Sequence, residues 1–157
     1  MVSLIVTEIP ESRAIRSLAA AWSVRQWRAS FPSDTAQWYL NLYKSGDFSK
    51  KLPVTVAAII NGNLVGVGSL VADDELPGAS EPGPWLAAVY VTPSFRGKGA
   101  GSKIVQELLD HAFLLGYREV FCYTETKRDW YQKMGWQLVR EALLAKHEVA
   151  VLKYTLR

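Results

Sequence analysis

The stretch VYVTPSFRGKGAGSKIVQELLDHA, from Val89 to Ala112, joins an apolar, β-branched segment to a segment with helical periodicity. Between them, the six residues from Arg96 to Gly101 include three glycines and two cations. Each glycine weakens regular structure, so three of them together indicate a specific demand on the backbone. The first N–H groups of a helix lack partners within the helix, and the helix dipole adds positive charge there. The stretch therefore predicts a strand, a phosphate-binding turn and a helix.

The spacing of the glycines excludes two common phosphate-binding loops. A P-loop requires G-x-x-x-x-G-K-[ST], a pattern that Gly97 does not begin. The dinucleotide fingerprint G-x-G-x-x-G also fails, because the glycines stand at positions 97, 99 and 101. What is present is Arg-x-x-Gly-x-Gly, formed by Arg96, Gly99 and Gly101. With VYVTP before it, this motif resembles the acetyl-CoA signature of the GNAT superfamily of N-acetyltransferases.

A second motif supports the same resemblance. WYQKMGW, from Trp130 to Trp136, is similar to the family's aromatic-Tyr-x-Lys-x-Gly-aromatic signature and follows the first motif at the family's usual distance. The order of elements read from the sequence also matches the family from Ser3 to Leu156. The resemblance implies an α/β fold with a central, mixed but mostly antiparallel twisted sheet of about seven strands and about four helices. It implies one N-acetyltransferase domain over residues 1–157.

Apolar periodicity and turn residues place the individual elements. Strands are predicted at 2–9, 53–60, 64–71, 85–91, 120–123, 136–139 and 149–156. The first helix is predicted after Ser12 as N-cap, and the second after a capping box formed by Asp34 and Gln37, fading at Gly46. The third helix follows the glycines and ends at Gly116, and a short fourth helix covers 126–134. Asn61 to Asn63 predicts a hairpin turn, and residues 73–84 predict a loop.

Composition narrows the class of protein. The chain has 157 residues, is 49% hydrophobic and carries a formal charge of +3, with its cations scattered, which argues against a nucleic-acid partner. No apolar run approaches the roughly 18 residues of a membrane span, and the start lacks the features of a signal peptide. The lone Cys122 suits a reducing compartment. No His, Cys and Asp cluster has metal-ligand spacing. We expect a soluble, cytoplasmic protein with no membrane partner and no metal.

The resemblance assigns residues to acetyl-CoA, the expected co-substrate. Backbone groups of Val89 and Val91 would pair with the pantetheine arm, and a backbone N–H near Val91 or Tyr90 would polarise the thioester carbonyl. Thr124 stands where relatives often have an asparagine that contacts this arm. Tyr131 falls on the family's general-acid tyrosine, which would protonate the leaving thiolate. The remaining coenzyme contacts would come from the turn and the first helical residues: Arg96, Gly97, Lys98, Gly99, Ala100, Gly101 and Ser102.

The general base is open at this stage. Many relatives carry a glutamate on or near the strand before the glycines, but here that strand reads WLAAVYV, without a carboxylate. Deprotonation of the amine would fall to a water chain or to Asp74, Glu75 or Glu125. The three acidic residues from Asp73 to Glu75, with Trp22, Trp27 and Trp38 in flanking helices, suit a cationic amine with an apolar body.

The sequence thus predicts an acetyl-CoA-dependent N-acetyltransferase that acts by direct transfer on a primary amine of a small molecule, for example an aminoglycoside-like or polyamine-like compound. Two alternatives remain open. One is a coenzyme-A-binding module without catalysis, acting as a sensor or partner domain. The other is an acetyltransferase for protein N-termini or lysines. A homodimer is compatible with the resemblance.

Overall fold

The computed structural model describes residues 3–29, 31–43 and 52–157. Its strands are β1 (Leu4–Glu8), β2 (Val54–Ile60), β3 (Asn63–Val71), β4 (Trp85–Val91), β5 (Glu119–Thr124), β6 (Gln137–Leu144) and β7 (His147–Thr155). Its α-helices are α1 (Arg13–Trp27), α2 (Ala36–Leu42), α3 (Ala100–Leu114) and α4 (Arg128–Lys133). The predicted element order is confirmed. The structure adds a short 3₁₀ turn at Pro93–Phe95.

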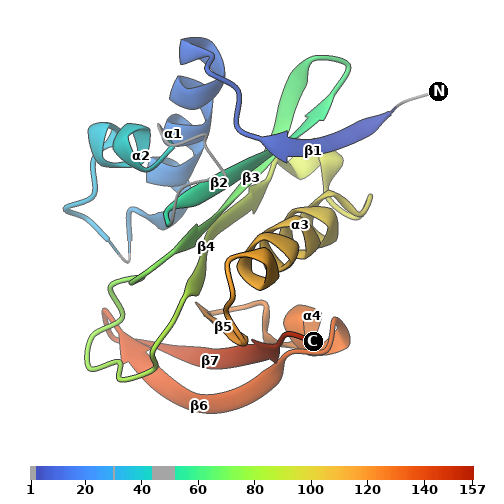
Figure 1. Ribbon diagram of the computed structural model, residues 1–157. Coiled ribbons are helices and arrows are strands. Elements are labelled where there is room, and N and C mark those ends of the chain that lie inside the picture. The colour runs from blue at the N-terminus through green and yellow to red at the C-terminus, as the bar shows by residue number, and fades with distance from the viewer. Residues whose placement is uncertain (1–2, 30, 44–51) are drawn as a thin grey trace.

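The seven strands form one sheet in the order β1-β2-β3-β4-β5-β7-β6. All neighbouring pairs are antiparallel except β4 and β5, which run parallel. Helices α1 and α2 cover one face of the β1–β4 part, and α3 lies across the opposite face (Figure 1). Successive side chains of a strand point to opposite faces, so β4 contributes Leu86 to the cluster under α3 and Tyr90 to the cluster under α1 and α2.

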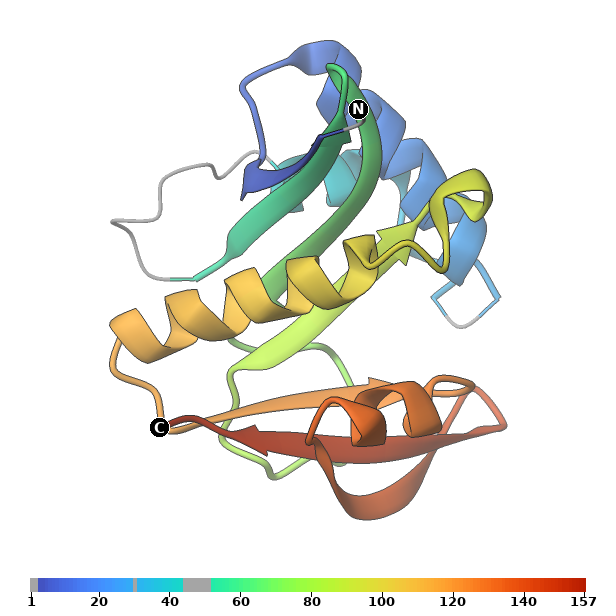
Figure 2. The ribbon, with the colours of Figure 1, turned by 90° about the vertical axis from the view of Figure 1, so that its right-hand side faces the viewer.

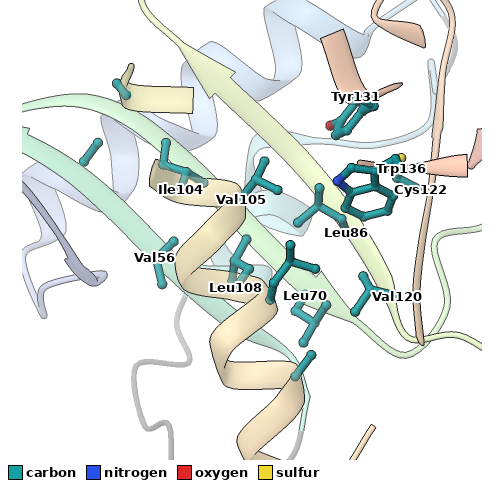
Figure 3. Packing of buried hydrophobic residues seen from close by; sticks show 14 of the residues in the cluster. Val56, Leu70, Leu86, Ile104, Val105, Leu108, Val120, Cys122, Tyr131 and Trp136 are labelled. Carbon is teal, nitrogen blue, oxygen red and sulfur yellow. The ribbon is translucent and has the colours of Figure 1, made fainter. Parts of the chain in front are cut away.

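The larger core lies between α3 and the sheet. Ile104, Val105 and Leu108 of α3 pack on Val56 and Leu70 in a cluster that also holds Leu86 and Val120 (Figure 3). At one end of this cluster Tyr131, Trp136 and Cys122 lie beside Leu86, which ties α4 and the second half of the sheet to the same core. The apolar side of α3 therefore faces the sheet.

Local signals account for most element ends. Ser12 caps α1, its Oγ accepting the Ile15 N–H at 3.2 Å. Asn61 and Gly62 adopt φ angles of 51° and 80° and form the two-residue turn that joins β2 to β3, as the sequence predicts. Gly116, with φ of 93°, follows the last turn of α3.

The capping prediction for the second helix is wrong by one residue. Thr35, not Asp34, is the N-cap, and its Oγ1 accepts the Trp38 N–H at 3.2 Å. Gln37 instead donates to Asn41 one turn later. The helix ends at Leu42, and the predicted fading at Gly46 lies outside the described residues. Asp34 is consequently free of a capping role.

The last two strands are longer than predicted. β6 continues past Val139 to Leu144, and β7 begins at His147, so the hairpin turn falls at Ala145 and Lys146, both with positive φ. Pairing with β7 overrides the helical preference of the Glu-Ala-Leu-Leu segment that ends β6. Helix α4 is shorter than the predicted 126–134.

Candidate functional site

The site begins where β4 and β5 separate. Their parallel pairing is limited to Trp85 opposite Phe121, with the Phe121 N–H donating to the Pro84 carbonyl at 2.9 Å. Beyond this point β4 remains paired with β3 only. The views in Figures 1 and 2 agree that β4 then diverges from the β5-β7-β6 part of the sheet. One edge of β4 is therefore unpaired beyond this point, and a ligand could bind along it as an added strand does.

A bulge in β4 sets which backbone groups face this opening. Val67 pairs with Tyr90 but Ser69 pairs with Ala87, so β4 carries one extra residue, and Ala88 takes a φ of 55°. The Thr92 N–H donates to Val65 of β3 at 2.9 Å. The backbone N–H and C=O groups of successive residues in a strand point to alternate sides. Those of Tyr90 therefore point to β3, as the Thr92 N–H does, whereas those of Val89 and Val91 point toward the opening. Of the two predicted carbonyl-polarising donors, the geometry favours Val91.

The turn from Arg96 to Gly101, called the glycine turn below, leads directly into α3. Gly97 and Gly99 have φ angles of 76° and 86°, and Gly99 is the N-cap of α3. Within the described chain, the N–H groups of residues 97–102 donate to no acceptor. Six donors thus gather at the positive end of a fifteen-residue helix. This is a fitting cradle for the pyrophosphate of a coenzyme.

The two cations of the glycine turn are exposed and lean on aromatic rings. Arg96 donates from Nε to the Val91 carbonyl at 2.8 Å, and its guanidinium lies 5.4 Å from the Tyr90 ring centroid. The Lys98 ammonium lies 5.2 Å from the Phe95 ring centroid. Arg96 therefore also fixes the end of β4, while Lys98 stands at the rim as a solvated charge.

Gly101 of α3 lies against Trp130 of α4. A Cβ atom at this position would lie 3.1 Å from Cζ2 of Trp130. The Trp130 ring in turn packs edge-on against Tyr131, with centroids 4.9 Å apart. The second sequence motif thus touches the first through this glycine, and the contact positions Tyr131 beside the opening of the sheet.

Tyr131 is 7% exposed and is held between Trp130 and Trp136, whose ring lies 5.3 Å away. Its hydroxyl makes no hydrogen bond to any other described residue. Burial raises the pKa of Tyr131 well above its usual value, and the nearby Cys122 and Asp74 raise it further. The phenol is therefore protonated across the physiological range and can act as a hydrogen-bond or proton donor.

One cleft of about 910 Å³ collects the predicted residues. Of the predicted coenzyme and catalytic residues, those that line it are Val89, Tyr90, Val91, Arg96, Gly97, Gly99, Ala100, Gly101, Ser102, Thr124 and Tyr131. Lys98 does not line it. Thr124 accepts the Lys127 N–H at 3.0 Å, which leaves its hydroxyl hydrogen for a ligand. Trp27 and Trp38 also line the cleft, whereas Trp22 packs in the core against Tyr90.

The far end of the cleft is acidic. Asp34, from the connection between α1 and α2, joins Asp73, Asp74 and Glu75, from the loop between β3 and β4; these four residues are called the acidic end below. The Tyr123 hydroxyl donates to the Asp74 carbonyl at 2.8 Å and fixes this loop against β5. Sequence reasoning missed Asp34, because the local pattern assigned it to a helix cap.

The pKa values of three carboxyl groups at the acidic end are raised, by burial and, for two of them, also by neighbouring like charges. Burial raises the pKa of Asp74 well above its usual value, and the charges of Glu75, Asp73 and Asp34 add to the effect. Burial likewise raises the pKa of Glu75, as do Asp34 and Asp73. The pKa of Asp34 is raised by burial alone. No described cation lowers any of these three pKa values.

An ion pair outside the cleft holds the loop that carries three of these carboxylates. Arg140 of β6 donates from Nε and Nη2 to the two carboxylate oxygens of Glu81, both at 2.8 Å. Glu81 has a 9% exposed side chain, and the bond to Arg140 lowers its pKa. This bidentate pair anchors the loop at its second end, as the Tyr123 bond does at its first.

Glu125 differs from the other predicted base candidates. It lines the cleft, but its carboxylate lies 3.3 Å from Nδ1 of His147 and is half-exposed. In the described part of the chain no three His, Cys, Asp or Glu residues are placed to hold a metal ion. No described helix has the length and apolar character to cross a membrane.

Comparisons with known proteins agree with this geometry. The model of the acetyltransferase (GNAT) family matches residues 14–136. Among solved structures, an N-acetyltransferase from Staphylococcus aureus Mu50 superimposes with a TM-score of 0.74 at 15% identity, over 99% of both chains. An aminoglycoside 6'-N-acetyltransferase complexed with coenzyme A gives 0.72 at 14% identity, over 96% of both chains. A protein from Salmonella typhimurium with its cofactor acetyl-CoA gives 0.70 at 15% identity, over 99% of this chain and 95% of that one. No curated protein sequence matches this chain.

Proposed function

Because the chain belongs to the GNAT family of acetyltransferases, we propose that it transfers the acetyl group of acetyl-CoA directly to a primary amine of a small molecule. One observation carries the proposal. The same cleft runs from the glycine turn, past Tyr131, to the acidic end. A cleft with free N–H donors at one end and carboxylates at the other suits a phosphate-bearing donor and a cationic acceptor.

The residues of the glycine turn fit the coenzyme. The unpartnered N–H groups of residues 97–102 would bind the pyrophosphate, with Arg96 and Lys98 adding charge at the rim. The open edge of β4 would bind the pantetheine arm through Val89 and Val91, as an added strand does. Thr124 lies across the opening on β5 and would donate its hydroxyl to the same arm.

The proposed acetyl transfer would take place where the coenzyme and the amine meet in the cleft. The amine nitrogen forms a bond to the acetyl carbon while the carbon–sulfur bond breaks, and the coenzyme leaves as its thiol. The Val91 N–H would stabilise the negative charge that develops on the carbonyl oxygen. Tyr131 would supply the proton that the departing sulfur takes up.

Asp74 is the carboxylate best suited to accept the proton of the amine. An ammonium group with a pKa near 10 must be deprotonated before it attacks. Asp74 is half-buried in the cleft, its pKa is raised toward the range of a useful base, and its charge acts on Tyr131. Glu75 is exposed, and Glu125 is engaged with His147. We therefore assign the general-base role to Asp74.

A screen of primary amines, read by release of the coenzyme thiol from acetyl-CoA, tests the proposed function. Thiol release should be slow without amine and should rise with saturation for at least one small amine, with mass spectrometry showing a gain of one acetyl group. Gly99→Glu brings a negative charge into the pyrophosphate cradle, and Gly99→Ala is its matched control, because both variants carry the same strain at a φ of 86° and only the first adds the charge. A protein that binds acetyl-CoA but shows no amine-dependent release would instead be a binding module.

A further inference from the structure

The acidic end contains more negative charge than one amine requires. Four carboxylates line it, and none of them forms an ion pair with a described Lys, Arg or His. Among the described residues of the cleft, the cationic side chains are Arg96 and Lys127, and neither forms an ion pair with these four carboxylates. Among the described residues, the acidic end therefore has no cation paired with it.

Tyr39 gives an independent indication of a ligand. It is 4% exposed and lines the cleft, and its hydroxyl has no hydrogen-bond partner in the part of the chain that the structure describes. Burial raises the pKa of Tyr39, and the charges of Asp34, Asp74 and Glu75 raise it further, so its hydroxyl lies within electrostatic reach of both acidic segments. The hydroxyl oxygen itself is not fully buried, so it reaches the space of the cleft, where a ligand can form the hydrogen bond that the described chain does not supply.

Aromatic rings border the same region. Tyr39 stacks on Trp27 with centroids 6.4 Å apart and meets Trp38 edge-on at 5.0 Å. Trp38 is 39% exposed although it is large and apolar. Ring faces attract ammonium groups and also cover the methylene groups that join them. Carboxylates beside rings therefore suit an alkyl chain that carries positive charge.

From this arrangement we infer that the acceptor is a dication, a compound with two ammonium groups joined by an apolar segment. One nitrogen would lie beside Asp74 and Tyr131 for acetylation. The second would be bound by Asp34 and Glu75, which lie on separate loops close enough for the charge of Asp34 to raise the pKa of Glu75, with the Tyr39 hydroxyl accepting a hydrogen bond from it. The inference rests on the proposed function and names the class of its acceptor.

A matched pair of probes, diaminobutane and butylamine, tests this inference. Both have a primary amine and the same alkyl length, and only the first has a second charge. Their binding is measured by calorimetry in the presence of desulfo-coenzyme A, which cannot transfer an acetyl group. We expect the diamine to bind at least about tenfold more tightly, the effect of one charge-assisted pair in a partly buried site.

Two isosteric variants locate the second ammonium. Asp34→Asn and Glu75→Gln should each reduce the preference for the diamine about tenfold and leave butylamine binding nearly unchanged. Asp110→Asn, on the outer face of α3, is the matched control and should change neither. Because both pKa values are raised by folding, the charged forms destabilise the protein at neutral pH, so both variants should melt at the same or a higher temperature.

The outcomes separate the inference from the proposed function. Equal affinities for diamine and monoamine, or a preference that survives both variants, would overturn the dication inference even if both amines were acetylated. Tight, carboxylate-dependent diamine binding without any acetylation by acetyl-CoA would support the dication site and contradict the proposed transfer.

Discussion

Tyr131→Phe separates a chemical role of the hydroxyl from a packing role of the ring. The substitution keeps the ring that Trp130 and Trp136 hold at 4.9 and 5.3 Å, and it removes a hydroxyl with no partner among the described residues. The free energy of unfolding should therefore change by less than about 1 kcal/mol. If the hydroxyl assists the leaving thiolate, kcat should fall about 10²-fold, or about 2.7 kcal/mol, with KM for acetyl-CoA nearly constant.

The raised pKa of Tyr131 refines the expected mechanism. A thiol has a pKa of about 8.5 and an ordinary phenol about 10, so complete proton transfer to the sulfur is already uphill by about 2 kcal/mol. Burial increases this gap. Tyr131 should then act chiefly by hydrogen bonding to the sulfur as charge develops there, and the alkaline side of the pH–rate profile should not reflect its ionisation. For the measurement of kcat and KM, the acceptor is the amine that gives the fastest thiol release in the screen.

The control for this experiment is Tyr154→Phe on β7, whose ring contacts the other side of Trp136 at 5.6 Å and does not line the cleft. It should leave kcat unchanged. A Tyr131→Phe protein with kcat within about threefold of the unaltered protein would refute the acid role. A lower melting temperature at constant kcat would assign Tyr131 to packing.

Three further predictions use other parts of the cleft. Gly101→Ala should weaken acetyl-CoA binding about tenfold by calorimetry, because its methyl group displaces the Trp130 ring, and an unchanged Kd would refute the close contact. Arg140→Met should lower the free energy of unfolding by about 1–2 kcal/mol at pH 7, allowing for the partial exposure of Arg140. Folding lowers the pKa of Glu81, so this stabilisation is fully present above the pKa of the unfolded state, about 4.3. Urea titrations at several pH values should show that it is lost as the pH falls through the lowered pKa of the folded state. Because the pKa of Asp74 is raised, kcat/KM of the unaltered protein should decline on acidification from a pH nearer neutrality than an ordinary carboxyl group would give. Asp74→Asn should lower kcat/KM and abolish this decline. An unchanged pH profile would assign the base role elsewhere.

The glycine turn and its place between β4 and α3 could be predicted because their determinants are local. The spacing of Arg96, Gly99 and Gly101 resembles the family's acetyl-CoA signature, and a glycine-rich turn before a helix is suited to phosphate. The contact between Gly101 and Trp130 then joins both motifs in space. In contrast, the bulge at Ala88 has no glycine or proline to mark it, since WLAAVYV reads as an uninterrupted strand.

The acidic end could be predicted only in part, because it is assembled from distant segments. Asp73, Asp74 and Glu75 are adjacent in sequence and were recognised as a group. Asp34 belongs to a different connection, and a capping pattern and a cleft position look the same in sequence. Thr35, one residue later, is an equally good cap and takes the role, which leaves the Asp34 carboxylate to the cleft.

The net charge of +3 conceals a strong separation of charge along the cleft. Free N–H groups and the exposed Arg96 create positive potential at the glycine turn, while the acidic end is negative, and β4 and the buried Tyr131 line the same cleft. An anionic ligand is thus attracted to one end and repelled from the other, and a cationic ligand experiences the reverse. Under the proposed function, each substrate would be disfavoured at the other's position by charge, and the two would meet beside Tyr131 and Val91. Burial and neighbouring like charges raise the pKa of Asp74, so the arrival of a cation at the acidic end would lower that pKa and favour the carboxylate form that a base requires.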